Sequence, residues 1–568
     1  MGSVLIQGGT VVDGTGAAAH RADVRVRDGV IAEVGPGLSA EGGGERTVDA
    51  AGAYVAPGFI DLHTHLDPSL FWDPLCDPMP QHGVTTVVTG NCSLSLAPLR
   101  PEHRQAITTI FAFVEDIPRE AFEKAVPWSW STFAEFRDCV VGRGGTAVNA
   151  AYLVGHTPLR MFVMGDEAWE RPATAAEREQ LAGVLDGCLR AGAFGLSTSM
   201  FDEDPAGRPV PSVLADDAEH AALIDVLARY DAPLEFIPRQ QLRYMAGDVD
   251  RFVGLCAPRG VASSWLGIYH NERAERPFHE MLDRAAAWQN EGIRVYPQVT
   301  PRTMDVRPNF FGGMSFMNLA QGWNRVIQAD EAEKRRLLAD PDWRRVAREE
   351  WDTVTFNPFP HRVPDRVRIM AARRPENQWF VGRTLADLVA ARGGHPSDVL
   401  ADWVLEEDLV PDIVGVGLSN YDPDGVAGLL RHPGALVSNS DAGAHLTMFC
   451  AAGDTTLLLA RHVRDRGDFT VEEAVHALTG RQADAFNLSH RGRIAPGLAG
   501  DLTVFALEDL AWEPDSFVAD LPGGGRRLRR PPGGFRHTIV AGVVTQTEGT
   551  LTGAQPGGFI GRGEAAPA

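Results

Sequence analysis

Two histidines stand two positions apart at the end of an apolar segment near the start of the chain. The segment APGFIDLHTH, residues 56–65, reads as a strand that follows a Pro-Gly turn and ends in His63 and His65. Side chains at positions i and i+2 of a strand point to the same side, so both imidazoles converge on one point. Neutral imidazole is a ligand that suits zinc and similar ions. The spacing therefore predicts a metal site at this strand end.

A cysteine closes the next strand-like segment, GVTTVVTGNC, which ends in Cys92. A thiolate at a strand end, level with two histidines from the preceding strand, could bind the same metal or bridge two ions. The alternative is a buried free cysteine, which is common in proteins. The spacing alone leaves both interpretations open.

An aspartate ends a late strand-like segment, LVSNSD, at Asp441. A carboxylate there can bind a metal weakly while it takes a proton from attacking water and later passes it to a leaving amine. An aspartate after a strand is also common as a helix cap or turn residue. Because this segment comes late and lies upstream of a helical stretch at 471–485, we predict that Asp441 is the catalytic acid/base.

These groups need a scaffold, and the middle of the chain alternates strand-like runs with amphipathic helices. Candidate strands lie at 85–88, 147–154, 234–237, 265–269, 294–298, 413–418 and 435–439, and helical stretches at 175–191, 331–351 and 471–485. This alternation is typical of βαβ units and predicts a parallel sheet, closed or open. In a barrel of this kind, catalysis occurs at the C-terminal ends of the strands.

Both ends of the chain carry short strands separated by Gly- and Pro-containing turns. They lie at 4–6, 24–26 and 30–34 near the start, and at 501–505 and 538–544 near the end. We expect residues 1–55 and 491–568 to form one small β domain, with residues 56–490 as the catalytic barrel. Two separate β caps are the alternative.

Composition excludes several classes of partner. The chain has 568 residues, 44% of them hydrophobic, and a net charge of -22, which argues against nucleic acid or an anionic membrane surface. The sequence contains neither an apolar run of about 18 residues nor a signal peptide. Its six cysteines form no CxxC pair, as in a cytosolic enzyme with reduced thiols. We predict a cytoplasmic protein that acts on a small molecule, and whether it forms a homo-oligomer stays open.

Taken together, the motifs resemble the amidohydrolase superfamily. The resemblance rests on HTH after PGFID, on TGNC, on the late SD and on GRIAPGLAGDLTVF. The segments GVTTVVTGNC, NAAYLVGHTPLR, GAFGLST and YPQVTP are similar to the D-aminoacylase branch, the N-acyl-D-amino-acid deacylases. The resemblance extends from about residue 4 to about residue 560. It implies a (β/α)8 TIM-like barrel, a small β-sandwich domain built from both termini, and hydrolysis of an N-acyl bond at one or two zinc ions.

The resemblance also assigns roles to individual residues. His63 and His65 match the ligands of the first strand, and Cys92 matches the metal-binding cysteine. His270, in LGIYH, falls where the branch has a histidine ligand on a later strand. Asp441 matches the aspartate that acts as acid and base.

The chain departs from the branch at three places. Where the branch has a histidine in a strand similar to THMR, this sequence has LEFIPR with Ile237 at that position. Glu235, two residues earlier on the same strand face, could supply an oxygen ligand instead, or one metal site is weakened. The residues after Asp441 are AGAHL, without the arginine that often binds the substrate carboxylate, and Ser93 replaces the usual glycine. These departures bear on the substrate more than on the superfamily.

Four further residues are candidates for substrate binding. His156 could donate a hydrogen bond to a substrate carbonyl, with a satisfied core histidine as the alternative. Arg239 and Arg302 end strand-like runs and could pair with a substrate carboxylate or form salt bridges at the rim. His445, four residues after Asp441, could contact substrate, and His445 or Glu235 is the next candidate for proton transfer.

The sequence thus predicts a metal-dependent hydrolase of a C–N bond, with an N-acyl-D-amino acid or related N-acyl compound as substrate. A hydrolase of a cyclic amide, lactam or ester is one alternative, because barrels of one family change substrate through their loops. A degenerate barrel that binds a ligand without turning it over is the other, and Ile237 is the feature that favours it.

Overall fold

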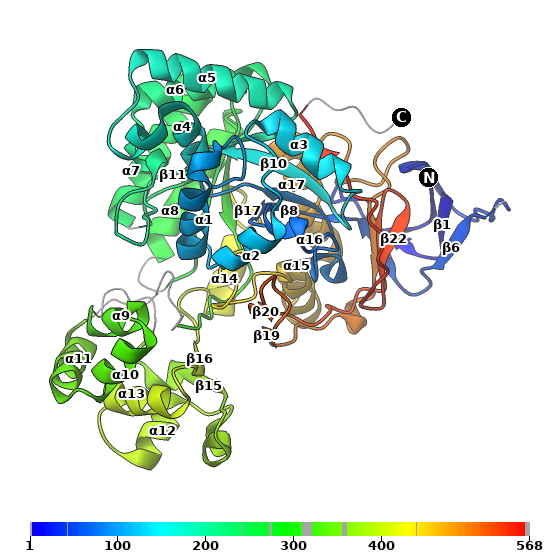
Figure 1. Ribbon diagram of the computed structural model, residues 1–568. Coiled ribbons are helices and arrows are strands. Elements are labelled where there is room, and N and C mark those ends of the chain that lie inside the picture. Colours follow the sequence, from blue (N-terminus) through cyan, green and yellow to red (C-terminus); the bar gives the residue numbers. More distant parts are fainter. Residues whose placement is uncertain are drawn as a thin grey trace.

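The computed structural model describes residues 3–42, 44–240, 242–271, 275–308, 321–354, 360–438 and 440–562. A curled sheet of parallel strands lies at the centre of the molecule, with helices along its outer side (Figure 1). Within the described residues its main path runs in the order β8, β9, β10, β11, β12, β13, β14 and β17, and the short β24 (Phe559–Ile560) pairs with β10. The predicted α/β architecture with a parallel sheet is confirmed.

The central strands are almost entirely buried, as parallel strands covered on both faces must be. Every residue of β8, β9 and β10 is buried. Of the strand expected at 435–439, residue 439 lies outside the described residues. The strands are β8 (Phe59–Thr64), β9 (Val84–Thr89), β10 (Asn149–Gly155), β11 (Gly195–Ser199), β12 (Leu234–Ile237), β13 (Ser263–Trp265), β14 (Val295–Val299) and β17 (Leu436–Val437).

Several helices around this sheet begin at side-chain caps. Thr174 and Glu177 form a capping box at α5 (Ala175–Arg190), and Asp216 caps α6 (Asp217–Arg229), which satisfies amides that the first turn leaves unpaired. The other helices around the sheet are α1 (Arg104–Val114), α2 (Arg119–Ala125), α3 (Phe133–Gly142), α4 (His156–Met164), α7 (Leu242–Cys256), α8 (Glu275–Asn290), α14 (Pro423–Leu430), α16 (Val471–Leu478) and α17 (Gly480–Phe486). No helix in the described ranges combines the length and apolar character needed to cross a membrane.

The chain that follows β17 lies beside β8, the first strand of the sheet. The His65 amide donates a hydrogen bond to the Ala442 carbonyl over 2.7 Å, and the Asp441 amide donates to the His63 carbonyl over 3.1 Å. An isolated parallel bridge joins Thr64 to Ala442. These contacts hold Asp441 level with the two histidines, although almost four hundred residues separate them in sequence.

Strands from the two ends of the chain share one sheet. In the described residues its order is β23, β22, β21, β18, β7, β2 and β3, so β18 (Leu502–Phe505) pairs with β7 (Tyr54–Pro57). The other members are β2 (Thr10–Val11), β3 (His20–Arg21), β21 (His537–Val540), β22 (Val543–Thr547) and β23 (Thr550–Leu551).

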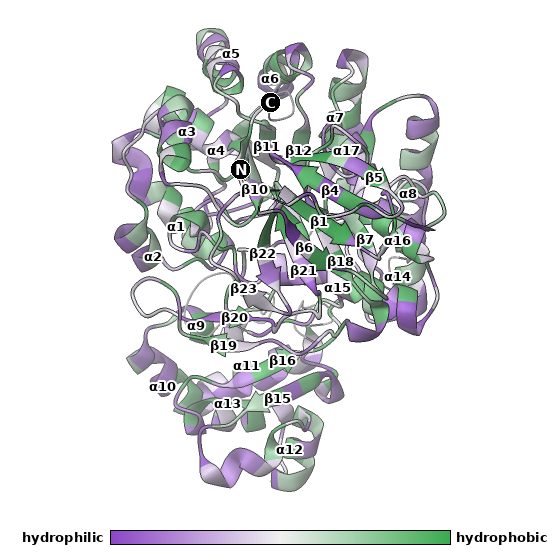
Figure 2. Ribbon diagram, turned by 90° about the vertical axis from the view of Figure 1, so that its right-hand side faces the viewer, coloured by the Kyte–Doolittle hydropathy of each residue, from purple (hydrophilic) through white to green (hydrophobic). Residues whose placement is uncertain are grey.

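A second terminal sheet belongs to the first fifty residues. Its order is β5 (Val30–Gly35), β4 (Asp23–Arg27), β1 (Ser3–Gln7) and β6 (Arg46–Asp49). Val24 of this sheet and Leu502 and Ile539 of the other belong to one buried cluster. Figure 2 shows the strands of both ends gathered on one side of the molecule.

Residues 321–415 contain a helical lobe with a hydrophobic core of its own, which projects from the sheet in Figure 1. Trp323 and Trp403 are completely buried in that core. The lobe contains α9 (Gln321–Gln328), α10 (Glu331–Ala339), α11 (Pro341–Thr353), α12 (Leu385–Arg392) and α13 (Pro396–Glu406).

Two expectations are corrected in this region. The run at 413–418 is not a strand of the parallel sheet, because β16 (Asp412–Gly415) pairs antiparallel with β15 (Val367–Ala371). Hydrophobic pattern identifies a strand but not its partner. The helix expected at 331–351 is divided into α10 and α11, since Pro341 lacks the amide that would continue it and begins a new helix after Asp340.

Candidate metal centre

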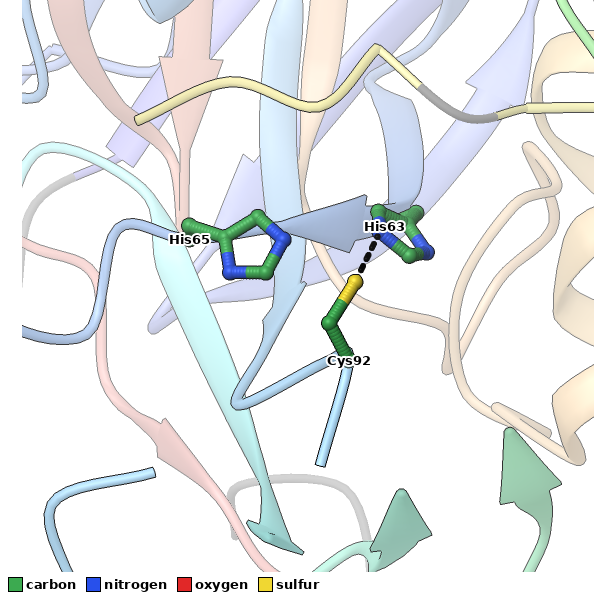
Figure 3. Close-up of side chains that lie close together, drawn as sticks. All are labelled: His63, His65 and Cys92. Atoms are coloured by element: carbon green, nitrogen blue, oxygen red, sulfur yellow. Dashed lines mark hydrogen bonds between the residues drawn. The ribbon is translucent and has the colours of Figure 1, made fainter. Parts of the chain in front are cut away.

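The three earliest predicted ligands converge at the C-terminal ends of two adjacent strands. His63 lies in β8, His65 follows it, and Cys92 follows β9 (Figure 3). Cys92 Sγ is 3.4 Å from His63 Nε2. Ligand atoms of all three residues lie within 4.8 Å of one another, and both imidazoles are completely buried. The structure thus brings the two histidines and the cysteine together.

Asp441 completes this group from the last strand. Its Oδ1 lies 3.6 Å from His63 Nε2 and 3.3 Å from His65 Nε2. Two ligands of a tetrahedral zinc ion, with bonds of about 2.0–2.3 Å, are separated by about 3.3–3.6 Å. The donor types of His63, His65, Cys92 and Asp441 therefore suit zinc, and the spacing fits between Cys92 Sγ and His63 Nε2 and between Asp441 Oδ1 and both histidines. Cys92 and Asp441 belong to different groups of possible ligands among the described residues, and His65 is common to both groups.

The turn that presents Cys92 requires an unusual backbone. Cys92 has φ +53° and Gly90 has φ +83°, both in the left-handed region. A Cβ at Gly90 would lie 2.5 Å from the Leu153 carbonyl oxygen on β10. A glycine at this point lets β9 end in a tight turn against β10, and the turn places the thiol beside His63.

We expect Gly90→Ala to destabilise the protein more than an alanine substitution at a glycine that has a positive φ but no close neighbour. Alanine in the left-handed region costs about 1–2 kcal/mol, and a clash with backbone adds about 1–3 kcal/mol. Gly52→Ala is the matched control, because Gly52 has φ +73° with nothing within 4 Å of the added Cβ. Urea unfolding of both variants measures the difference, and equal losses would show that the contact with Leu153 is unimportant.

Two buried glutamates face the Nδ1 atoms of the two histidines. Glu235 Oε1 on β12 lies 3.5 Å from His63 Nδ1, and its Oε2 accepts a hydrogen bond from the Cys92 amide over 3.3 Å. Glu115 Oε1 lies 3.5 Å from His65 Nδ1. Glu115 follows α1 and was not among the sequence candidates. It joins His65 and Asp441 in a second group whose ligand atoms lie within 4.8 Å of one another.

His445 and Arg302 stand on the far side of Asp441. His445 Nε2 lies 3.5 Å from Asp441 Oδ2 and 3.9 Å from Glu115 Oε2, so this side chain borders the centre. The buried Arg302 guanidinium donates to the Ser440 carbonyl over 3.0 Å and to the Cys450 carbonyl over 3.3 Å. Arg302 therefore supports the segment that carries Asp441.

His270 lies away from the four facing atoms. The expected strand at 265–269 ends at Trp265, so His270 does not stand at a strand end. Its amide donates to Asn420 Oδ1 over 2.6 Å, and its ring lies against Gly425 of α14, where an added Cβ would come within 2.1 Å of the ring. His270 belongs to neither group of possible ligands found among the described residues.

His156 and Arg239 are occupied by protein groups. His156 Nδ1 is 2.9 Å from Thr198 Oγ1, and its Nε2 is 2.8 Å from Glu219 Oε1, while Glu219 also pairs with Arg160. This arrangement is that of a satisfied buried histidine, the alternative that the sequence left open. Arg239 makes two hydrogen bonds to Asp248, of 2.9 and 2.6 Å, as in a salt bridge at the rim.

Comparison with known proteins decides the family. Residues 46–306 and 361–546 match the amidohydrolase family. The chain belongs to this family. The gap in the match, 307–360, includes part of the helical lobe.

The similarity of this amidohydrolase to its relatives extends over nearly its whole length. It is 30% identical to an uncharacterised protein of Mycobacterium tuberculosis, over 98% of this chain and 92% of that protein. It is 29% identical to the N-acyl-D-aspartate deacylase of Alcaligenes xylosoxydans xylosoxydans, over 88% of this chain and 85% of the deacylase. A solved structure of D-aminoacylase, described by its binuclear metal centre, matches with a TM-score of 0.63 at 25% identity and covers 98% of this chain and 99% of that one. The predicted resemblance and the predicted class, a metal-dependent hydrolase of amide bonds, are confirmed.

The electrostatics of the amidohydrolase centre favour a bound cation. Burial raises the pKa of Glu115 to about 8, although His65 beside it opposes the change. Burial alone would lower the pKa of His65, but Glu115 and Asp441 outweigh it and raise that pKa to about 9. Burial, together with Glu115 and Glu235, raises the pKa of the Cys92 thiol well above its usual value. Three carboxylates and a thiol buried around two imidazoles are costly unless a positive ion compensates them.

A cavity of about 220 Å³ adjoins the centre without containing it. Its wall includes Leu66, Ala442 and Leu446, which follow His65, Asp441 and His445 in the sequence. None of the four metal-facing side chains lines it.

Proposed function

We propose that this amidohydrolase is a zinc-dependent deacylase that hydrolyses N-acyl-D-amino acids or related N-acyl compounds. The observation that carries the proposal is the convergence of ligand atoms on His63 and His65. Cys92 Sγ lies 3.4 Å from His63 Nε2, and Asp441 Oδ1 lies 3.6 Å from His63 Nε2 and 3.3 Å from His65 Nε2. Two imidazoles, a thiolate and a carboxylate are donors that zinc prefers. The D-aminoacylase structure and the N-acyl-D-aspartate deacylase support the substrate class.

We assign the four facing residues to the metal, as one ion or as part of a pair like that described for D-aminoacylase. An ion held there supplies Lewis-acid chemistry, which polarises a carbonyl and lowers the pKa of water toward neutrality. Glu235 and His270, which the sequence offered as ligands, lie outside this set. Glu235 faces the opposite edge of the His63 ring, and His270 packs on α14.

Asp441 performs the proton transfer in this proposal. Its side chain is 19% exposed, whereas the histidine side chains are completely buried, so water reaches the carboxylate. Burial alone would raise the pKa of Asp441, but hydrogen bonding by His65 and the nearby imidazoles hold it well below its usual range. An ionised carboxylate can take a proton from attacking water and return it to the departing nitrogen. His445, beside Oδ2, is placed to contact substrate or hold the carboxylate.

The two arginines that the sequence suggested for the substrate carboxylate have partners within the protein. Arg239 is paired with Asp248, and Arg302 is occupied by the carbonyls of Ser440 and Cys450. The relatives favour deacylation over the cyclic-amide alternative and over a barrel that only binds ligand.

A substrate panel tests the proposal. Metal-replete protein should release free amino acid from N-acetyl-D-amino acids with apolar, acidic and basic side chains, faster than from the L enantiomers or from cyclic amides such as hydantoins. The matched control is Asp441→Asn, which should be inactive on the same compounds. Turnover of cyclic amides alone, or none of any compound despite bound metal, would contradict the proposal.

We also propose the finer architecture that the sequence suggested. Two hydrogen bonds join β8 to the segment after β17: the Asp441 amide donates to the His63 carbonyl, and the His65 amide donates to the Ala442 carbonyl. They support closure of the sheet as a (β/α)8 barrel. The shared cluster of Val24, Leu502 and Ile539 supports a β-sandwich domain from residues 1–55 and 491–568. All six cysteines are free thiols, as expected for a cytoplasmic enzyme. Homo-oligomerisation stays a prediction.

A further inference from the structure

In each of the two histidines, Nδ1 is the ring nitrogen that does not face Asp441, and a glutamate lies next to it. Nδ1 of His63, Nδ1 of His65, Oε1 of Glu235 and Oε1 of Glu115 are all buried, and none has a hydrogen-bond partner among the described residues. These four atoms form two facing pairs, each 3.5 Å apart. Each unpaired histidine Nδ1 therefore has an unpaired glutamate oxygen as its neighbour.

The two edges of each ring face different chemistry. On the Nε2 edge, His63 faces Cys92 Sγ at 3.4 Å and both histidines face Asp441 Oδ1. On the Nδ1 edge, His63 faces Glu235 and His65 faces Glu115. An imidazole cannot direct both nitrogens at one ion, so an ion bound at Nε2 leaves Nδ1 of each ring to its glutamate.

We propose that Glu235 and Glu115 are positioning residues, which hold a proton on Nδ1 of His63 and His65 so that Nε2 of each ring is free to bind the ion. The inference rests on the proposed metal centre. A metal-bound histidine generally donates its other N–H to a carboxylate or carbonyl, which fixes the tautomer and makes the ring a better donor. Each Nδ1–H···Oε1 bond forms when a 3.5 Å contact shortens by a few tenths of an ångström.

The two glutamates are anchored differently. Glu235 uses its other oxygen to accept from the Cys92 amide, so one carboxylate orients two metal-facing residues. Glu115 directly follows α1, and its carbonyl accepts a hydrogen bond from the His445 amide. The next residue, Asp116, accepts from the Thr447 amide over 2.7 Å. Glu115 is thus fixed to the segment that carries Asp441 and His445.

Metal titration of four variants tests the proposal. Glu115→Leu and Glu235→Leu remove the acceptor, and we expect zinc to bind about 10–100-fold more weakly with an unchanged number of ions per chain. Glu115→Gln keeps an amide oxygen toward His65, so its affinity should stay within about threefold of the parent. Glu235→Gln can accept from His63 or from the Cys92 amide but not both, so its affinity should fall between the parent and leucine values.

Glu219→Gln is the control for loss of a buried carboxylate, because Glu219 contacts His156 and Arg160 but no proposed ligand. Cobalt(II) supplies a second readout, since the near-ultraviolet thiolate band should persist in every variant if Cys92 still binds the ion. Loss of one ion per chain in Glu115→Gln would make Glu115 a ligand and overturn the proposal, as would parent-like affinity in the leucine variants. If the leucine variants do not fold, Glu235→Gln decides, and parent-like affinity or a lost ion overturns it. A parent protein that binds no metal would instead refute the proposed function.

Discussion

Asp441→Asn is expected to lower kcat by about 10²–10⁴-fold, the usual contribution of a positioned proton-transfer group. Asparagine keeps the shape of the side chain, and the hydrogen bond from the residue 441 amide to the His63 carbonyl does not depend on it. The fold and most of the metal should therefore remain, while the base is lost. Steady-state kinetics on a proven N-acyl substrate, with metal content measured on the same samples, separates the two effects.

His445→Gln is the companion to that experiment. His445 Nε2 lies 3.5 Å from Asp441 Oδ2, and burial, partly opposed by Asp441, lowers the pKa of His445 to about 4. A neutral His445 is a poor general acid at pH 7, so we expect this variant to lose much less activity than Asp441→Asn. Near-normal turnover in Asp441→Asn combined with collapse in His445→Gln would transfer the proton-transfer role to His445.

Cys92→Ser is expected to weaken zinc binding by more than the 10–100-fold typical of a partner outside the ligand set. Serine replaces a thiolate with a neutral hydroxyl that binds zinc poorly. Because burial raises the pKa of the Cys92 thiol, the thiol is protonated before the ion arrives, and binding must release that proton. Affinity should therefore fall as pH falls, since protons compete with the metal.

Calorimetry in buffers of different ionisation enthalpy counts the protons released. The parent protein should release one proton more than Cys92→Ser for each ion bound beside Cys92. Cys139→Ser, on α3, is the matched control because Cys139 belongs to neither group of possible ligands in the described residues. Equal proton release and equal affinity in the parent protein and Cys92→Ser would remove Cys92 from the centre.

The placement of His63, His65, Cys92 and Asp441 followed from strand periodicity and from the rule that parallel strands end at one edge. Periodicity depends only on local sequence, whereas the second rule applies because these strands do share one parallel sheet. The expected strand ending next to His270 and the run at 413–418 differ from the structure for a shared reason. Local pattern does not say where a strand ends or which strand it pairs with, and β13 stops at Trp265 while β16 pairs in the helical lobe.

Glu115 was missed because it follows a helix and not a strand. One signal was nevertheless present. Glu115 and Asp116 stand together at the C-terminus of α1, where negative charge opposes the helix dipole. Two acids in that position call for another role, and the structure shows them facing His65 and the Thr447 amide. No comparable sequence signal predicts contacts between distant residues, such as the hydrogen bond from Arg302 to the Ser440 carbonyl.

Zinc-edge X-ray absorption of the metal-replete protein tests the central claim most directly. A centre built from His63, His65, Cys92 and Asp441 predicts bound zinc with nitrogen and oxygen neighbours at about 2.0–2.2 Å and a sulfur neighbour at about 2.3 Å. The sulfur contribution should disappear in Cys92→Ser. Zinc surrounded only by nitrogen and oxygen in the parent protein, or the absence of bound zinc after reconstitution, would contradict the account.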